Sequence, residues 1–458
     1  MNFPTIHHIS ECFIKPNYPP EESKQPFYLT PWDIAMLSVN YIQKGLLFVK
    51  PPQATNQVGN GFMETLLDRL KNSLSLTLVH LYPLAGRLKT SKGENPPSYL
   101  VYVDCDDSPG AKFIYATLDV SVSDILSQTY VPTFVQSFFD HHKAVSHDGH
   151  TTSLLSIQVT ELVDGVFIGC SMNHCLGDGT SYWNFFNSWS EIFRANGDGI
   201  STNSISCQPM LNRWFPDGHG PIINLPYTHP DEFISRFEAP KLKERIFHFS
   251  AESIAKLKVK ANAECNVVGK FSSLQSLAAL VWRCITRARN IALDQTTSCK
   301  LAANSRSRLD PPVPDNYFGN SLHALRAFTT AGELLEHDLG WAAWKVHQAV
   351  ANFNHKEVRG WLDEWLQSPY VYQIGRFFDP NCVMMGSSPK FNKYGSEFGM
   401  GKAVALRSGY ANKFDGKVSC YPGREGEGSI DLEICLLPDR MSALESDKEF
   451  MEVAGLSH

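Results

Sequence analysis

A histidine and an aspartate stand four residues apart in the segment His174-Cys175-Leu176-Gly177-Asp178-Gly179. A neutral imidazole can take a proton from a hydroxyl or an amine near pH 7, which acyl transfer from a thioester requires. An aspartate beyond a tight turn can hold such a loop in one orientation without touching the substrate. A plainer interpretation stays open, because Asp178 is also a good helix N-cap. Among sixteen histidines, roughly one His-x-x-x-Asp pattern is expected by chance.

The elements around this segment place the two side chains at a strand end and a helix start. Residues Thr152–Glu161 alternate between apolar and polar, Asp164-Gly165 is a tight-turn signal, and Val166–Asn173 returns as a second strand. The helix expected after Gly179 is rich in aromatic residues: Trp183, Phe186, Trp189 and Phe193. We therefore expect a strand to end just before His174 and a helix to begin near Asp178.

Helices and strands mix along the rest of the chain without regular alternation, which predicts an α/β or α+β fold with mixed sheets. Ser250 is expected to cap the helix that follows it. The expected helices are Phe62–Leu81, Ser272–Arg287 and one opening at Pro438-Asp439, and the expected strands are Arg245–Phe249, the alternating Cys299, Leu301 and Ala303, and Ser429–Leu437.

With 458 residues, the chain is too long for one compact core, so two domains are expected. Residues 195–230 are dense in glycine, proline, serine and asparagine, which is typical of a loop. So long a loop is unusual inside a domain, and it is interpreted as an interdomain crossover. The predicted domains are 1–194 and 231–458.

Charge and cysteine usage restrict the partners and the compartment. The net charge is −6 and the isoelectric point about 6.2, which favours neither nucleic acid nor an anionic membrane as a partner. The N-terminus lacks the pattern of a signal peptide, and no apolar run is long enough to span a bilayer. Eleven cysteines without a CxxC pair, and no Asn-x-Ser/Thr site, favour free thiols in a reducing compartment. A cytoplasmic, monomeric protein is expected.

No metal site is expected. The histidines between His141 and His150 lie in a polar segment, and they are interpreted as solvent-exposed.

Taken together, several motifs resemble those of the plant BAHD acyltransferases, from about Ser10 to Phe450. The segment from His174 to Gly179 resembles the family's HxxxDG signature, and Glu397-Phe398-Gly399-Met400-Gly401 resembles its DFGWG motif. Further landmarks in the same order are Leu81–Leu88, the helix start at Ser272, Asn304–Arg308 and Asp315–Asn320. Their joint occurrence is more specific than any one motif.

The resemblance implies two similar-sized, chloramphenicol-acetyltransferase-like domains with mixed sheets and a channel at their interface. It implies His174 as general base, with acyl-CoA entering from one side and a hydroxyl or amine acceptor from the other. Transfer would be direct, without an acyl-enzyme, because both reactants are held together. Asp178 would point away from the channel and form a bidentate pair with Arg306. Without the resemblance, Arg306 would be interpreted as a surface cation.

Three departures from the family pattern stand out. Glu397 replaces aspartate and Met400 replaces an aromatic residue in the second motif, whose Phe398, Gly399 and Gly401 are kept. This loop is implied to be structural, and its glycines suit a backbone with positive φ. Upstream, Gly386-Ser387-Ser388 replaces a Thr-Ser-Trp stretch that stabilises the oxyanion in many relatives. Ser387 and Ser388 are candidate oxyanion donors or ordinary loop serines. Asn320 is a further candidate that shapes the site or stabilises a turn.

Coenzyme A carries phosphates, and the resemblance places some of its contacts near Lys270, Ser272 and Ser273. Amide groups at a helix start, with serine hydroxyls and a lysine, suit a phosphate. The alternative is a plain N-cap at Ser272. Acyl-CoA is expected as co-substrate, without a permanently bound cofactor.

Two other functions stay open. The first is a condensation-domain-like enzyme that uses a carrier-bound thioester and an HHxxxDG motif, although Asn173 rather than histidine precedes His174. The second is a diverged relative with lyase or binding activity. The identities of the acyl donor and the acceptor are not readable from the sequence.

Overall fold

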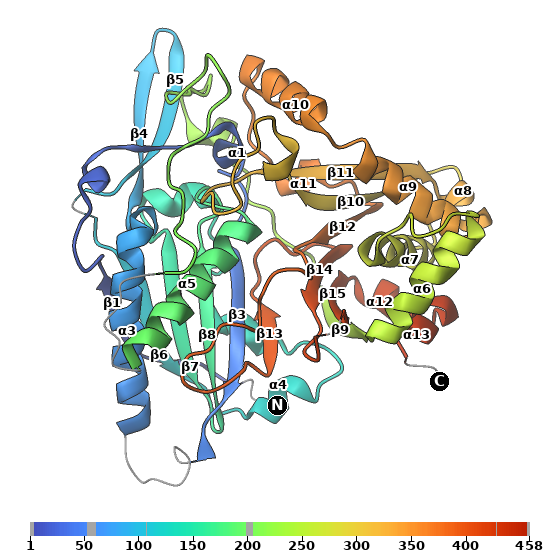
Figure 1. Cartoon of the computed structure of the whole chain (residues 1–458), viewed down its shortest axis with the longest axis horizontal. Coiled ribbons are helices and arrows are strands. Elements are labelled where there is room, and N and C mark those ends of the chain that lie inside the picture. The colour runs from blue at the N-terminus through green and yellow to red at the C-terminus, as the bar shows by residue number, and fades with distance from the viewer. Residues whose placement is uncertain (1–3, 53–60, 107, 198–204, 427, 456–458) are drawn as a thin grey trace.

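The computed structural model describes residues 4–52, 61–106, 108–197, 205–426 and 428–455. Two six-stranded sheets dominate it, and Figure 1 shows them side by side with helices packed on each. The first has the order β1-β6-β7-β8-β3-β13, the second has the order β11-β10-β12-β14-β15-β9, and a small sheet has the order β2-β5-β4. Each large sheet contains parallel and antiparallel pairs, which confirms the predicted mixed-sheet fold.

The strands have the following bounds: β1 His7–Ile14, β2 Phe27–Tyr28, β3 Ile42–Val49, β4 Arg87–Glu94, β5 Pro97–Asp104, β6 Ala111–Thr117, β7 Leu155–Glu161, β8 Gly165–Met172, β9 Lys243–Phe249, β10 Thr296–Asn304, β11 Leu322–Thr330, β12 Cys382–Gly386, β13 Ala405–Ser408, β14 Lys417–Pro422 and β15 Ile430–Leu436. The helices are α1 Pro31–Ile34, α3 Gly61–His80, α4 Val122–Leu126, α5 Gly179–Gly197, α6 Ala251–Glu264, α7 Ser273–Ala288, α8 Ala331–Glu336, α9 Leu339–Ala351, α10 His355–Gln367, α11 Ile374–Phe377, α12 Pro438–Glu445 and α13 Lys448–Val453.

The first sheet is covered by α3 and α5, which share one apolar core with it. In α3, Leu66, Leu70 and Leu74 recur every four residues and are all buried, as expected for one face of a helix. The predicted helix Phe62–Leu81 is confirmed within one residue at each end. The α5 aromatics pack into the same core, so they fix the helix that follows the His174 loop.

The second sheet buries one face against α6, α7, α9, α12 and α13. Alternate residues of β14 and β15, among them Val418 and Leu432, belong to this core. Because side chains alternate along a strand, the residues between them face the opposite way. Ser250 caps α6 through its hydroxyl, as predicted.

The chain crosses between the sheets more than once. Residues 205–242 contain, among the described residues, only a short 3-10 helix, Pro230–Glu232, and isolated bridges. This agrees with a loop-rich connection. β13, however, pairs with β3 of the first sheet, so the C-terminal half contributes a strand to the N-terminal sheet. The domain boundaries at 194 and 231 stay a prediction.

A bilayer crossing would require a long apolar helix, and none occurs in the described ranges.

Candidate active site

His174 lies in the turn between the end of β8 and the start of α5. Its backbone carbonyl accepts a hydrogen bond from Asn320 Nδ2 at 2.7 Å. The ring nitrogen Nδ1 is buried without a side-chain or backbone partner of good geometry, yet the residue keeps partial solvent exposure. The turn therefore holds the backbone of His174 firmly while the residue stays partly accessible to solvent.

Desolvation by the surrounding protein lowers the pKa of His174 below its ordinary value of 6.5. Its own backbone carbonyl, Asp178 and Asn320 raise the pKa, whereas the charge of Lys417 lowers it further. The lowering effects prevail, so the imidazole is neutral at pH 7 and carries a free lone pair.

Asp178 and Arg306 form the bidentate pair expected from the sequence. Arg306 Nη1 donates to Asp178 Oδ2 at 2.7 Å, and Nη2 donates to Oδ1 at 3.1 Å. Arg306 is fully buried and Asp178 is 4% exposed. Burial alone would raise the pKa of Asp178, but Arg306 and backbone donors hold that pKa below its ordinary value. Arg306 is thus a buried structural cation rather than a surface cation.

Asp178 also acts as the N-cap of α5. Its Oδ1 accepts hydrogen bonds from the backbone N–H groups of Thr180 and Ser181 at 3.0 and 3.1 Å, and its Oδ2 accepts one from Ser321 N. The capping interpretation and the ion-pair interpretation therefore both describe the same carboxylate.

Two buried ion pairs, Arg306 with Asp178 and Arg213 with Asp33, hold the segment Tyr317–Ser321. Arg306 donates to the carbonyls of Tyr317 and Gly319, and Arg213 donates to the carbonyl of Phe318 at 2.8 Å. Both pairs therefore fix the segment that presents Asn320 to His174.

The second pair, Asp33 with Arg213, was not predicted. Asp33 Oδ1 accepts from the backbone and side-chain nitrogens of Asn320, and Oδ2 forms an ion pair with Arg213. Asp33 also completes a capping box with Thr30. The Thr-x-x-Asp spacing was the available sequence signal, but it indicates only a helix start and not a contact 287 residues away.

Ser387 and Ser388 follow the end of β12. Ser387 has a φ of 65°, which is unusual for a residue with a side chain, and its Oγ accepts a hydrogen bond from Lys393 Nζ at 2.8 Å. Ser388 Oγ accepts one from the backbone of Lys390. In the described part of the chain no hydrogen bond joins either serine to His174, so their role as oxyanion donors stays a prediction.

The start of α7 is a complete capping box. Ser272 Oγ accepts from Gln275 N, and the Gln275 side chain accepts from Ser272 N. The plain N-cap interpretation therefore accounts for Ser272. Ser272 and Lys270 are exposed and Ser273 is half-buried, so contact with coenzyme A at these residues stays a prediction.

The loop Glu397–Gly401 packs on α5 rather than at His174. Phe398 is fully buried, with its ring centroid 4.7 Å from that of Trp189 and 5.4 Å from that of Phe193. Ser190 Oγ donates to the carbonyl of Glu397. Gly399 and Gly401 have φ values of 76° and 74°, as predicted, and Met400 packs half-buried against the same core.

The histidines between 141 and 150 are not uniformly solvent-exposed, contrary to prediction. The His141 side chain is 8% exposed and bonds Ser153. His147 and His150 are half-buried, with hydroxyl partners on Tyr99 and Thr90. The loop packs back onto the small sheet, which its polar composition did not indicate.

A model of the Transferase family matches residues 5–451 of the chain. An uncharacterized acetyltransferase of Arabidopsis thaliana is 36% identical over 453 residues, which cover 98% of this chain and 99% of the relative. The BAHD acyltransferase DCR of the same plant is 34% identical, covering 97% of this chain and 92% of its own length. Among solved structures, vinorine synthase superposes with a TM-score of 0.73 at 19% identity, covering 99% of this chain and 98% of its own.

The superposition confirms the two-domain acyltransferase fold. The first condensation domain of the calcium-dependent antibiotic synthetase superposes less well, with a TM-score of 0.54 over 94% of this chain and 96% of its own, at 14% identity. On the family match and the full-length relatives, the chain belongs to the Transferase family, as an acyltransferase of the BAHD group.

Proposed function

We propose that this protein transfers an acyl group from an acyl-CoA thioester to a hydroxyl or amine of a small plant metabolite, with His174 as general base. The observation that carries the proposal is the state of His174. The residue is surrounded by protein, yet it keeps partial solvent exposure, and the pKa of its imidazole is lowered. On this proposal the residue lines a narrow passage where both reactants meet.

The proton moves through one ring nitrogen. Nδ1 is the buried nitrogen, and in the proposed neutral tautomer it carries the proton. Nε2 then keeps the lone pair and takes the proton of the acceptor O–H or N–H as that atom attacks the thioester carbonyl. When the C–S bond breaks, the proton on Nε2 passes to the thiolate. The products are the ester or amide and free coenzyme A, without an acyl-enzyme.

In this proposal Asp178 and Arg306 do not touch the reactants. They fix the turn that bears His174 from behind, while Asn320 fixes its carbonyl. Ser387 or Ser388 is proposed as oxyanion donor, and Ser272, Ser273 and Lys270 as contacts of coenzyme A. Relatives support the co-substrate: the structure of TRI101 from F. sporotrichioides was solved with coenzyme A and T-2.

A cytoplasmic, monomeric protein is proposed as well. All eleven cysteines are free thiols, which suits a reducing compartment. A fluorescent fusion and sedimentation of the purified protein test the two statements separately.

The reaction is tested by offering a set of CoA thioesters (acetyl, malonyl, benzoyl and hydroxycinnamoyl) together with a plant metabolite extract, followed by mass spectrometry. We expect new acylated products in equal amount to the free coenzyme A released. A parallel arm offers the same acyl groups on a phosphopantetheinyl carrier protein. Turnover only from the carrier, or loss of an extract component without consumption of any thioester, would replace the proposal with a condensation or a lyase reaction.

A further inference from the structure

The two large sheets meet along a charged face. On β14 and β15, Val418, Cys420, Leu432 and Ile434 enter the apolar core beneath α7, so the residues between them face the first sheet. Lys44 of β3 in the first sheet reaches across and donates from Nζ to Tyr421 Oη at 2.6 Å. The junction is therefore lined by titratable groups rather than by an apolar core.

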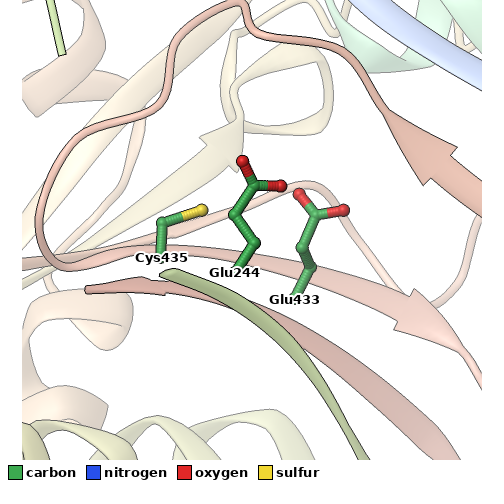
Figure 2. Close-up of side chains that lie close together, drawn as sticks. All are labelled: Glu244, Glu433 and Cys435. Atoms are coloured by element: carbon green, nitrogen blue, oxygen red, sulfur yellow. The ribbon is translucent and has the colours of Figure 1, made fainter. Parts of the chain in front are cut away.

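The carboxylates of this junction already have a cation. Figure 2 shows Glu244 and Glu433 close to Cys435, a grouping that resembles a metal site. Lys413 Nζ, however, forms an ion pair with Glu244 and lies 4.0 Å from Glu433. Ser408 also donates to Glu433. An ammonium group thus takes the place that a metal ion would need.

Three further lysines at the junction, Lys44, Lys393 and Lys417, have no carboxylate in direct contact among the residues that the structure describes, and the more distant charge of Glu433 does not offset their desolvation. None of them forms an ion pair with a carboxylate of the described residues. Lys393 Nζ donates to Ser387 Oγ and to the carbonyl of Cys420, both at 2.8 Å, whereas Lys417 has no hydrogen-bond partner in the described ranges. Desolvation lowers the pKa of all three, that of Lys44 to about 8. A buried anion would remove this cost.

A missing side chain makes room for the ammonium group of Lys417. A Cβ atom on Gly386 would overlap Lys417 Nζ. Gly386 does not have a positive φ, so its backbone conformation does not require glycine. Glycine at this position of β12, one residue before Ser387, therefore matters because it leaves space for the ammonium group of Lys417.

Lys417 also lies near the chemistry. Its charge is among the influences that lower the pKa of His174, and both Lys417 and Lys44 keep partial solvent exposure despite their surroundings. The two lysines are thus partly reached by solvent, as His174 is.

We propose that Lys417, in the notch left by Gly386 and backed by Lys44 and Lys393, binds a carboxylate carried by one of the two reactants beside His174. The proposal rests on the acyl transfer proposed above and narrows its substrate class. The carboxylate belongs either to the acyl donor, as in a thioester of a dicarboxylic acid, or to the acceptor, as in a hydroxy acid.

Two binding experiments on the full chain distinguish these sources. In the donor arm, calorimetry compares succinyl-CoA with butyryl-CoA. In the acceptor arm, with coenzyme A present, it compares 3-(4-hydroxyphenyl)propanoate with its methyl ester. Because a charge-assisted hydrogen bond in a buried site is strong, we expect the acid to bind about tenfold to a hundredfold more tightly than its neutral partner in one arm.

Three variants connect this preference to the notch. Lys417→Met removes the charge but keeps an apolar side chain of similar length. Gly386→Ala displaces only the flexible end of Lys417. The glycine variant therefore keeps the test possible if Lys417→Met does not fold. Both are expected to abolish the preference. Lys390→Met, at an exposed lysine of the neighbouring loop, makes the same charge change and should retain it.

The outcomes separate the two proposals. Equal binding of acid and neutral partner in both arms, or a preference that survives in Lys417→Met and Gly386→Ala, overturns the carboxylate site while acyl-CoA binding stands. Failure of every thioester to bind overturns the proposed function itself.

Discussion

Two groups of desolvated, charged side chains act on His174 or its turn, and they differ in how far their charges are compensated. Around Asp178, both carboxylate oxygens have at least two donors, and Arg306 bonds two carbonyls besides the carboxylate. At the junction of the sheets, Lys417 has no partner of its own in the described ranges, and Lys44 has only a phenol. One group is nearly saturated, and the other carries surplus positive charge.

This difference in charge compensation indicates that the two groups have different roles. A buried charge with all its partners in place rigidifies the backbone around it, and it has nothing left to offer a ligand. A desolvated charge without a partner costs stability, and such groups gather where a ligand supplies the missing charge. Under the two proposals, the paired group at Asp178 positions His174, and the unpaired group faces the reactants.

Removal of the imidazole itself should have the largest effect. His174→Ala is expected to lower kcat by about 10²–10⁴-fold, the usual contribution of a general base, with the melting temperature close to that of the wild type. Steady-state release of coenzyme A measures kcat. The matched control is His229→Ala, at a histidine side chain that is 61% exposed, which should keep full turnover.

Removal of one partner of the Asp178–Arg306 pair should mainly lower the free energy of unfolding. Asp178→Ala leaves Arg306 buried without its counter-charge, and a loss of about 3–5 kcal/mol in the free energy of unfolding is expected. Urea denaturation followed by fluorescence measures it.

Asp178→Asn separates the two roles of that carboxylate, because asparagine still caps α5 but cannot neutralise Arg306. Most of the loss should remain in this variant. Full stability of Asp178→Asn would assign the stabilisation to the cap alone.

The Glu397–Gly401 loop provides a comparison away from the chemistry. Gly399→Ala places a side chain at a φ of 76°, and a loss of about 1–2 kcal/mol in stability is expected. Thermal unfolding measures this loss, and kcat at 25 °C should stay within about twofold of the wild type. A large drop in kcat with unchanged stability would show that the loop takes part in the reaction.

The smallest stability change is expected at the unpaired group. Lys417→Met should alter the free energy of unfolding by no more than about 1 kcal/mol, and in the stabilising direction, because it removes an uncompensated charge. A loss comparable to that of Asp178→Ala would mean that Lys417 has a structural partner after all.

The elements that carry His174 were predictable from local pattern, and the contacts that complete the site were not. The alternation of apolar and polar residues predicted β7, and the Asp164-Gly165 turn signal predicted the start of β8. Together they predicted that a strand ends just before His174. The pair of Asp178 with Arg306 followed from the family resemblance rather than from the residues alone. Asp33 and Arg213 were missed because each bonds residues far away in the chain, and no local pattern encodes such contacts.

The charged junction was missed for a different reason. Lys417, Ser419 and Tyr421 alternate with Val418 and Cys420, which predicts a strand with one polar face. A polar face normally lies in solvent. Here the first sheet covers it, through β13 and Lys44, and the sequence carries no sign of that packing.

The pH dependence of kcat/KM tests the central claim, that a neutral His174 is the base. Because the pKa of His174 is lowered from 6.5, the ring is half-protonated only at a pH below that value. We therefore expect kcat/KM to fall in a single acid limb with a midpoint below pH 6.5, a limb absent from the residual rate of His174→Ala. A midpoint above 6.5, or an unchanged limb in His174→Ala, would contradict the account.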